Sequence, residues 1–405
     1  ITAYRFSDGG VAWETNISGG LPPENQQAGF ITNSGYYYYV DNAKVLRALN
    51  LVTGAVETIA NLSSVFSYTL SPCIEDGYIC FRGLDSGEIC EPAPGIRLRL
   101  ADAGHILGSA IAEVWLEEGG LERKLVFSGD LGHSGAPIMR DPARIAEADL
   151  VIMESTYGAR NHRSWQATWD ELAEVFAEAN ASRGNILIPA FAVGRTQELL
   201  YLFRKHYHDW GIDRWQVFVD SPMAIQATEV YARHRSLFDS DAMATLGNGE
   251  DTFNLPNLRL SETPEESMAL NRIRAGAMII AGSGMCEAGR IRHHLRNWLP
   301  DPRATVLFVG FQAEGTLGRL LRDGAKAVRI QGDTVKVAAH MAEMTDYSGH
   351  ADGPELGRWI QARGPVRGGV FLVHGEPEAI EGLAKRVPGR GIVPEAAIFR
   401  PALDE

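Results

Sequence analysis

From residue 94 to residue 405, short apolar runs alternate with amphipathic stretches, and this alternation constrains the fold more than any other feature. The run 96–100 alternates apolar and basic residues, which predicts a strand with one buried face. The runs 185–189 and 306–309 are apolar throughout, as strands buried on both faces are. Large apolar residues recur at helical spacing within 169–179. The pattern therefore predicts a mostly parallel sheet covered by helices. Further expected strands span 110–116, 124–127, 150–153, 217–219, 278–280, 370–373 and 397–399, and further expected helices span 196–206, 355–362 and 377–386.

Residues 1–90 have a different texture, with short β-prone runs broken by glycine turns. Residues 3–15 resemble residues 48–58, and Gly35-Tyr36 recurs as Gly77-Tyr78. These offsets fall in the range of propeller blades, roughly 40–50 residues. The segment resembles about two blades of a quinoprotein-type β-propeller, although two blades cannot close a ring. An ordinary β-meander explains the same pattern, and both interpretations stay open.

The net charge of −13 and the cysteine pattern limit the classes of function. A nonspecific nucleic-acid binder is usually basic, so a nucleic-acid role here requires a local basic patch and bound metal. No apolar run reaches the length of a membrane span, and no signal peptide is visible, so we expect a cytoplasmic protein without a membrane partner. Three cysteines, Cys73, Cys80 and Cys90, cluster, and Cys286 stands apart. Their spacing fits no zinc knuckle; reduced thiols and a disulfide within the cluster both remain open.

Five segments place a histidine or a carboxylate among small residues, and four of them directly follow an apolar strand. Polar residues at strand ends mark the sites of α/β folds. Histidine and carboxylate side chains are ordinary zinc ligands, and paired metal ions polarise a phosphate and generate hydroxide. Each residue alone also has a structural explanation, such as a hydrogen-bonded core histidine or a carboxylate that caps a turn. The five segments are 102–110 with His105, 127–132 with Asp130, 154–158 with Glu154, 347–352 with His350, and 373–376 with His374.

In this order, the five segments resemble the metallo-β-lactamase fold of the β-CASP family of RNA- and DNA-processing nucleases. The segments 188–198, 220–224, 281–286, 289–295 and 310–319 match that family as well. The resemblance runs from about residue 91 to the C-terminus. It implies an α/β fold: a metallo-β-lactamase αββα sandwich, incomplete at its N-terminus, with an inserted Rossmann-like β-CASP domain and a preceding all-β segment. The implied domains are 1–90, the β-rich segment; 91–165 with 347–405, the metallo-β-lactamase domain; and 166–346, the β-CASP domain.

The resemblance also implies roles for the five conspicuous residues. His105 would ligate one zinc ion, Asp130 would bridge two, and His374 would ligate the second. Glu154 and His350 would form an acid–base pair, in which His350 protonates the leaving oxygen and Glu154 orients its imidazole.

Four residues of the middle region are candidates for phosphate contacts: Ser283, Gly284, Arg290 and His294. Ser283 and Gly284 also suit a tight turn after a strand. The stretch from Arg290 to Arg296 equally suits a solvated basic helix face. A basic run here would offset the acidic average locally, as a phosphate-binding cleft requires.

The sequence departs from the family where metal binding is concerned. The family carries a His-x-His-x-Asp-His motif before the segment of His105, and His105 is the first of the eleven histidines in this chain. Milder departures are Ala159, where the family often has Asp, and 331–333, which replaces a common His-Gly-Glu. We expect a zinc-dependent ribonuclease that hydrolyses phosphodiester bonds of RNA and whose activity is impaired because the His-x-His-x-Asp-His motif is absent.

Two alternatives follow from the missing motif. One is a catalytically inactive RNA-binding or scaffolding homologue of the family. The other is an interaction module built on residues 1–90, with the nuclease body as a remnant. Single-stranded RNA is the expected partner of both the ribonuclease and the inactive RNA-binding homologue. Whether the protein forms a homo-oligomer stays open.

Overall fold

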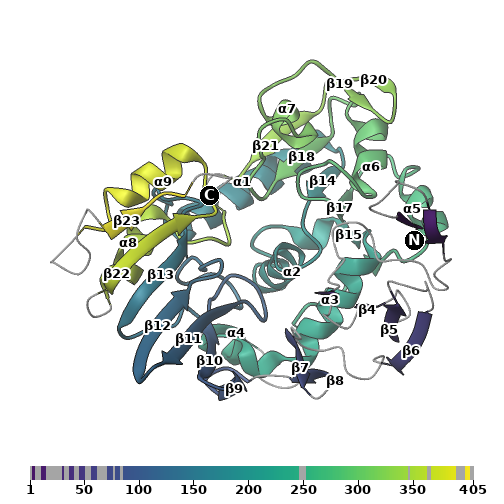
Figure 1. Cartoon of the computed structure of the whole chain (residues 1–405). Coiled ribbons are helices and arrows are strands. Elements are labelled where there is room, and N and C mark those ends of the chain that lie inside the picture. The colour runs from purple at the N-terminus through teal and green to yellow at the C-terminus, as the bar shows by residue number, and fades with distance from the viewer. Residues whose placement is uncertain are drawn as a thin grey trace. The chain divides into compact units, whose positions relative to one another are not determined.

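The computed structural model describes residues 85–245, 252–344, 347–362, 366–388 and 397–401, together with the strands that precede residue 83. The chain divides into two compact units, Ile1–Leu70 and Ser71–Glu405 (Figure 1).

The first unit consists of two small antiparallel sheets. In its four-stranded sheet, the strands lie side by side in the order in which they occur in the chain. A propeller blade and a β-meander both have this order, so both interpretations remain predictions. The strands are β1 (Thr2–Tyr4), β2 (Val11–Glu14), β3 (Phe30–Ile31), β4 (Tyr36–Val40), β5 (Val45–Asn50) and β6 (Val56–Asn61).

The second unit opens with a two-stranded hairpin, β7 (Ser71–Glu75) and β8 (Tyr78–Arg82), and continues into a seven-stranded mixed sheet. The sheet order is β23-β22-β13-β12-β11-β10-β9. Strands β9 to β12 are antiparallel, whereas β12, β13, β22 and β23 run parallel. The bounds are β9 (Ile89–Ala93), β10 (Ile96–Asp102), β11 (Ala110–Glu118), β12 (Leu121–Phe127), β13 (Ala148–Glu154), β22 (Val366–Val373) and β23 (Ile398–Phe399).

Helices cover one face of the seven-stranded sheet. Helix α8 (Gly353–Gln361) contributes Leu356 and Ile360 to this core, and helix α9 (Pro377–Ala384) contributes Leu383. The sheet residues that meet them are fully buried; they include Ile111, Val126, Val151, Met153, Val370 and Leu372. Residues of the opposite face remain accessible, and Phe127 is 39% exposed.

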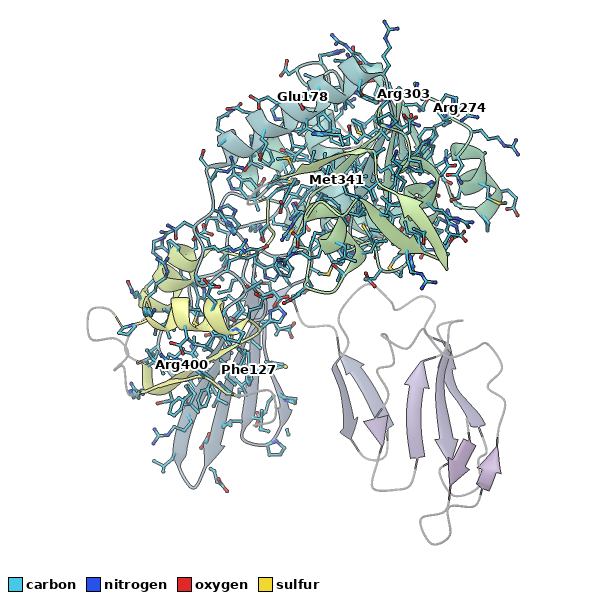
Figure 2. The ribbon with its side chains drawn as sticks, turned by 90° about the horizontal axis from the view of Figure 1, so that it is seen from above. Phe127, Glu178, Arg274, Arg303, Met341 and Arg400 are labelled. Carbon is cyan, nitrogen blue, oxygen red and sulfur yellow. The ribbon has the colours of Figure 1, made fainter. Side chains whose placement is uncertain are left out.

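A six-stranded sheet with the order β16-β15-β17-β14-β18-β21 forms the rest of the second unit, and all its strands run parallel. In Figure 2, the labelled Phe127 and Arg400 belong to the part with the seven-stranded sheet, and Glu178, Arg303 and Met341 belong to the part with the six-stranded sheet. The bounds are β14 (Ile186–Pro189), β15 (Gln216–Val219), β16 (Leu258–Leu260), β17 (Ala277–Ala281), β18 (Thr305–Phe308) and β21 (His340–Glu343).

Helices cover both faces of the six-stranded sheet. Ile186 and Ile188 of β14 pack in one core with the first three helices of the chain, whereas Leu187 packs in a second core on the opposite face with α5, α6 and α7. The helices are α1 (Trp165–Ser182), α2 (Arg195–Lys205), α3 (Pro222–Arg233), α4 (Ser240–Thr245), α5 (Pro264–Leu270), α6 (Ile291–Trp298) and α7 (Leu317–Arg322), with 3-10 turns Ile212–Arg214 and Arg235–Leu237 and a hairpin of β19 (Ala327–Ile330) and β20 (Asp333–Lys336).

The expected alternation of strands and helices is confirmed as a mixed α/β architecture with one mixed and one parallel sheet. The expectation of a mostly parallel sheet holds for β14 to β18 and β21; the other sheet is mixed because its strands before β13 are joined as antiparallel neighbours. Among the described residues, no helix combines the length and apolar character that crossing a bilayer requires.

Candidate active site

Three neighbouring parallel strands end at the same edge of the seven-stranded sheet, and each brings a site residue there. Asp130 lies just beyond β12, Glu154 is the last residue of β13, and His374 directly follows β22. Because the carboxyl ends of neighbouring parallel strands meet, these three side chains converge although His374 lies far along the chain from the others.

His105 and His350 reach the same place from loops. His105 follows β10 through Gly104, whose φ of 75° and lack of a side chain allow the turn, since a Cβ there would lie 2.5 Å from the carbonyl oxygen of Arg140. His350 precedes α8 and forms a β-bridge with Gly132. The two imidazole rings pack with their centroids 4.2 Å apart.

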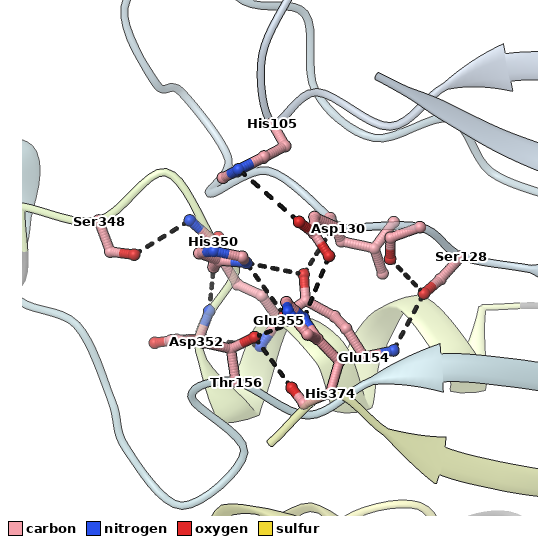
Figure 3. Close-up of polar contacts among 12 residues, drawn as sticks. His105, Ser128, Asp130, Glu154, Thr156, Ser348, His350, Asp352, Glu355 and His374 are labelled. Atoms are coloured by element: carbon pink, nitrogen blue, oxygen red, sulfur yellow. Dashed lines mark hydrogen bonds and ion pairs between the residues drawn. The ribbon is translucent and has the colours of Figure 1, made fainter. Parts of the chain in front are cut away.

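Asp130 lies between two histidines (Figure 3). Its Oδ2 is 4.0 Å from Nε2 of His105, and its Oδ1 is 3.2 Å from Nδ1 of His374. Ligand atoms of a tetrahedral zinc ion lie roughly 3.3–3.5 Å apart, because zinc–ligand bonds measure about 2.0–2.2 Å. The 3.2 Å separation to His374 matches that value, and the 4.0 Å separation to His105 is longer. One carboxylate oxygen and one imidazole nitrogen are thus available on each side of Asp130.

A second grouping overlaps with the first. Among the described residues, one set of three candidate ligands has donor atoms that all lie within 4.8 Å of one another, namely His105, Asp130 and His350. His374 is outside this set. His105 and His374, the two imidazoles that flank the carboxylate of Asp130, suit zinc chemically, so the residues present fit a metal ion.

The buried carboxylate of Glu154 holds His350. Its Oε2 and Oε1 lie 3.2 and 3.3 Å from Nδ1 of His350, and it also accepts a hydrogen bond from the backbone N–H of Leu131. Burial opposes the charged form of each partner, but the hydrogen bond and the opposite charge outweigh it. The pKa of His350 is therefore raised above its ordinary value and the pKa of Glu154 is lowered. The pair favours a protonated imidazole beside a carboxylate.

His105 is affected in the opposite direction. Burial, followed by the positive charge of His350, lowers its pKa below the ordinary value. A neutral imidazole is the form that binds a metal ion. The site thus combines a histidine biased toward the ligand form with a histidine biased toward the acid form.

A cavity of about 800 Å³ opens onto these residues. His105, Asp130, His350 and His374 line one side. The wall opposite comes from loops after β14 and β18 and includes Phe191 and other apolar side chains. The cavity therefore lies between the edges of the two sheets, within the second unit.

The four candidate phosphate contacts lie elsewhere in the structure. His294 is fully buried, with Nε2 2.6 Å from Oδ2 of Asp220 and Nδ1 3.0 Å from Oδ1 of Asn271. Arg290 donates from Nη1 to Oδ1 of Asp220 at 2.7 Å. Both are held within the protein by Asp220, whose pKa is lowered to about 2 because the hydrogen bonds to its carboxylate, that of His294 foremost, outweigh the opposing effect of burial.

Ser283 and Gly284 follow β17 in a turn, where Oγ of Ser283 accepts a hydrogen bond from the backbone N–H of Ala288 at 3.2 Å. None of the four residues lines the cavity described above, although Met285 does. Their role as phosphate contacts stays a prediction.

Sequence reasoning missed two features of this site. Thr156 places Oγ1 3.4 Å from Nδ1 of His374 and donates to the carbonyl oxygen of the same residue at 3.2 Å. The apolar wall with Phe191 and Phe311 was also not predicted. A position just beyond the end of a strand identified the polar site residues in the sequence. Phe191 and Phe311 have the same kind of position, after β14 and β18, so the same signal could have identified them.

Comparisons with known proteins show the family of the chain. Residues 196–321 match the model of the Beta-Casp domain, and residues 334–394 match that of the Zn-dependent metallo-hydrolase RNA specificity domain. The chain is 39% identical over 318 residues to ribonuclease TTHA0252 of Thermus thermophilus, a match that covers 78% of this chain and 71% of that protein.

Two archaeal proteins named transcription termination factor FttA are also similar. The match to the protein of Methanosarcina mazei is 30% identical over 316 residues, with 75% of this chain and 49% of that protein covered. The match to the protein of Pyrococcus abyssi is 30% identical over 313 residues, with 75% and 48% covered. The chain thus spans about half the length of these archaeal relatives.

Proposed function

The chain belongs to the β-CASP family of metallo-hydrolase ribonucleases, and on that premise we propose that it hydrolyses phosphodiester bonds of single-stranded RNA at Asp130. One observation carries the proposal: a carboxylate flanked by two imidazoles lies next to the pair of the half-buried His350 and the buried Glu154, at the side of a cavity. Metal ligands and a proton donor are thus within reach of the same substrate atom.

Zinc would be held on the two sides of Asp130. His105 and Oδ2 would supply one position, and His374 and Oδ1 would supply the other. Zinc bound here would polarise the phosphate and lower the pKa of bound water toward neutrality. His105 favours the neutral form that such binding needs.

His350 would act as the general acid. The carboxylate of Glu154 fixes its ring through Nδ1, which leaves the other ring nitrogen to donate a proton to the leaving oxygen. The raised pKa of His350 keeps the acid form populated toward neutral pH. Positioned proton transfer of this kind contributes about 10²–10⁴-fold to a rate.

We further propose that zinc binds weakly. Each side of Asp130 offers one imidazole and one carboxylate oxygen among the described residues, whereas catalytic zinc sites usually have three protein ligands. The histidine-rich motif of the family is absent from the sequence, since no histidine precedes His105. Activity should therefore depend on added zinc.

The domain limits and the finer fold are proposals too. We assign 91–165 with 347–405 to a metallo-β-lactamase domain and 166–346 to a β-CASP domain, which is supported by the seven-stranded sheet of β9–β13 with β22–β23 and by the parallel sheet of β14–β18 with β21. The accessible face of the seven-stranded sheet supports a sandwich whose second sheet is not among the described residues.

The test is cleavage of a labelled single-stranded RNA by the full chain, with zinc in excess and with a chelator. We expect cleavage with zinc, none with chelator, and a strong loss in His350→Ala. Met243→Ala, at an exposed residue outside the cavity, is the control and should cleave normally. Zinc-dependent cleavage that survives both His350→Ala and Glu154→Ala would contradict the mechanism.

A second candidate function is noncatalytic binding of RNA. The observation that favours it is the small number of ligands on each side of Asp130. It predicts that the full chain binds single-stranded RNA equally with zinc and with chelator and cleaves it under neither condition.

A further inference from the structure

The cavity beside the active site has an apolar wall with unusual exposure. Phe191, Val193 and Met223 are 46%, 39% and 52% exposed, although all three line the cavity. Met285 and Phe311 extend the same wall. Exposed apolar surface within a concave site marks contact with a ligand that is itself partly apolar.

The charges in the cavity do not favour binding through phosphates alone. Four carboxylates line it, namely those of Asp130, Glu198, Glu376 and Glu378, against the two arginines Arg160 and Arg195. Arg195 is engaged inside the protein: Nη1 lies 2.6 Å from Oε2 of Glu198, and its guanidinium stacks 3.8 Å above the ring centre of Tyr347. Affinity for RNA in this cavity must therefore come in part from its bases.

Phe191 has the geometry of a stacking platform. One side of its ring lies against Gly284, where a Cβ would come within 2.9 Å of both Cδ2 and Cε2. The carbonyl oxygen of Gly284 accepts a hydrogen bond from Nε2 of the buried Gln312 at 3.0 Å, which fixes the surface beneath the ring. With one side covered and 46% of the residue exposed, the ring offers its free side to the cavity.

The loop of Phe191 is anchored beside the catalytic residues. Oγ1 of Thr196 donates to the carbonyl oxygen of Phe191 at 2.8 Å. Gly194, at a φ of 85°, packs so closely against Ile106 that a Cβ there would lie 2.7 Å from its Cγ2. Because Ile106 is the neighbour of His105, the loop from the six-stranded sheet touches the loop that carries a candidate metal ligand.

We propose that Phe191, supported by Gly284, stacks on a base of single-stranded RNA next to the phosphate that is cleaved. The proposal rests on the proposed function, because the ligand is the RNA substrate. Aromatic side chains stack on any base, and each such contact is worth about 1–3 kcal/mol, or roughly 5- to 150-fold in affinity. Base-paired RNA keeps its bases stacked on each other, so the contact also selects single strands.

The test is a binding experiment on the full chain without zinc, so that no RNA is cleaved. Fluorescence anisotropy is measured with a labelled single-stranded RNA and with a series of the same RNA that lacks one base at successive positions. For the wild type, removal of one particular base should weaken binding roughly 5- to 150-fold. Phe191→Ala should weaken binding of the intact RNA by the same factor. With the RNA that lacks that base, Phe191→Ala and the wild type should bind with equal affinity.

Three further variants complete the experiment. Phe191→Trp should retain the affinity, and Gly284→Ala should reduce it, because the added Cβ displaces the ring. Met243→Ala is the matched control: Met243 is 46% exposed, like Phe191, but does not line the cavity. Thermal unfolding of each variant shows whether the fold is kept.

The outcomes separate the two proposals. If the wild type binds no RNA without zinc, this inference fails, and the proposed function is decided separately by the cleavage experiment with added zinc. Stacking by Phe191 is refuted if the wild type binds RNA and Phe191→Ala binds it equally well. It is also refuted if Phe191→Ala loses affinity by the same factor for every RNA of the series. In both cases the proposed function stands.

Discussion

The two sheets of the second unit are covered differently. Every residue of β14, β17 and β18 in the six-stranded sheet is buried, because helices pack on both faces. In the seven-stranded sheet, burial alternates along β11, because α8 and α9 cover one face only. The parallel sheet is therefore a closed core, and the mixed sheet retains one accessible apolar face.

The accessible face is continuous across the sheet. Strand register aligns one row of apolar side chains over six neighbouring strands, and each of them is at least partly exposed. The row consists of Leu100, Ala112, Phe127, Ile152, Phe371 and Phe399. Phe371 and Phe399 stack on each other with centroids 4.6 Å apart. The sheet that bears the candidate metal ligands thus has one face without a partner layer among the described residues.

The two sheets also contribute differently to the cavity. Strands and loops of the seven-stranded sheet bring the candidate metal ligands and the pair of Glu154 and His350, and loops of the six-stranded sheet bring the apolar wall with Phe191 and Phe311. A change on the first side should therefore alter the chemical step, and a change on the second side should alter affinity for RNA.

The largest effect is expected at His350. His350→Ala should lower kcat by about 10²–10⁴-fold, because it removes the proton donor, and should leave the affinity for RNA almost unchanged. Single-turnover cleavage and anisotropy on the same preparation check both values. A loss confined to RNA affinity would place His350 among the binding residues instead and would break the division between the two sides.

A smaller effect is expected from truncations on β11, which compare the two faces of the seven-stranded sheet. Ile111→Ala, at a fully buried residue, should cost about 2–5 kcal/mol of unfolding free energy. Leu116→Ala, on the same strand at 37% exposure, should cost at most about 1 kcal/mol. Denaturant unfolding measures both. Equal costs would mean that the face of Leu116 is covered after all.

The smallest effect is a shift in pH dependence. Glu154 raises the pKa of His350, so its removal lowers that pKa and deprotonates the acid at lower pH. Activity of a general acid is lost above its pKa; the alkaline limb of the kcat profile should therefore move to lower pH in Glu154→Gln. Glu113→Gln, a change of a buried carboxylate that pairs with Lys124, should leave the limb in place. An unmoved limb in Glu154→Gln would assign the titration to another group.

Local pattern predicted much of this molecule, and long-range contacts account for what it missed. The apolar runs marked β14 and β18, and small residues around Asp130 and Glu154 marked strand ends. Pattern alone could not show that β22 lies beside β13, because these strands are separated by the whole six-stranded sheet in sequence.

The basic stretch after Arg290 illustrates the same limit. The sequence suited a phosphate-binding run or a solvated helix face, but His294 and Arg290 contact Asp220, which lies 74 and 70 residues earlier. A partner so distant leaves no local signal. Phe191 was missed for a different reason: it lies just beyond the end of β14, as the polar site residues lie beyond their strands, but phenylalanine is common in cores and its exposure of 46% is visible only in the structure.

The most direct test of the account is the zinc content of the full chain and of two variants. Equilibrium dialysis followed by metal analysis should give zinc binding with a Kd weaker than about 1 μM, well short of the affinity of complete sites. Zinc bound per chain should fall in His374→Ala, which removes the imidazole of one of the two positions, and should be unchanged in His350→Ala. Two tightly held zinc ions per chain, or loss of zinc in His350→Ala with retention in His374→Ala, would contradict it.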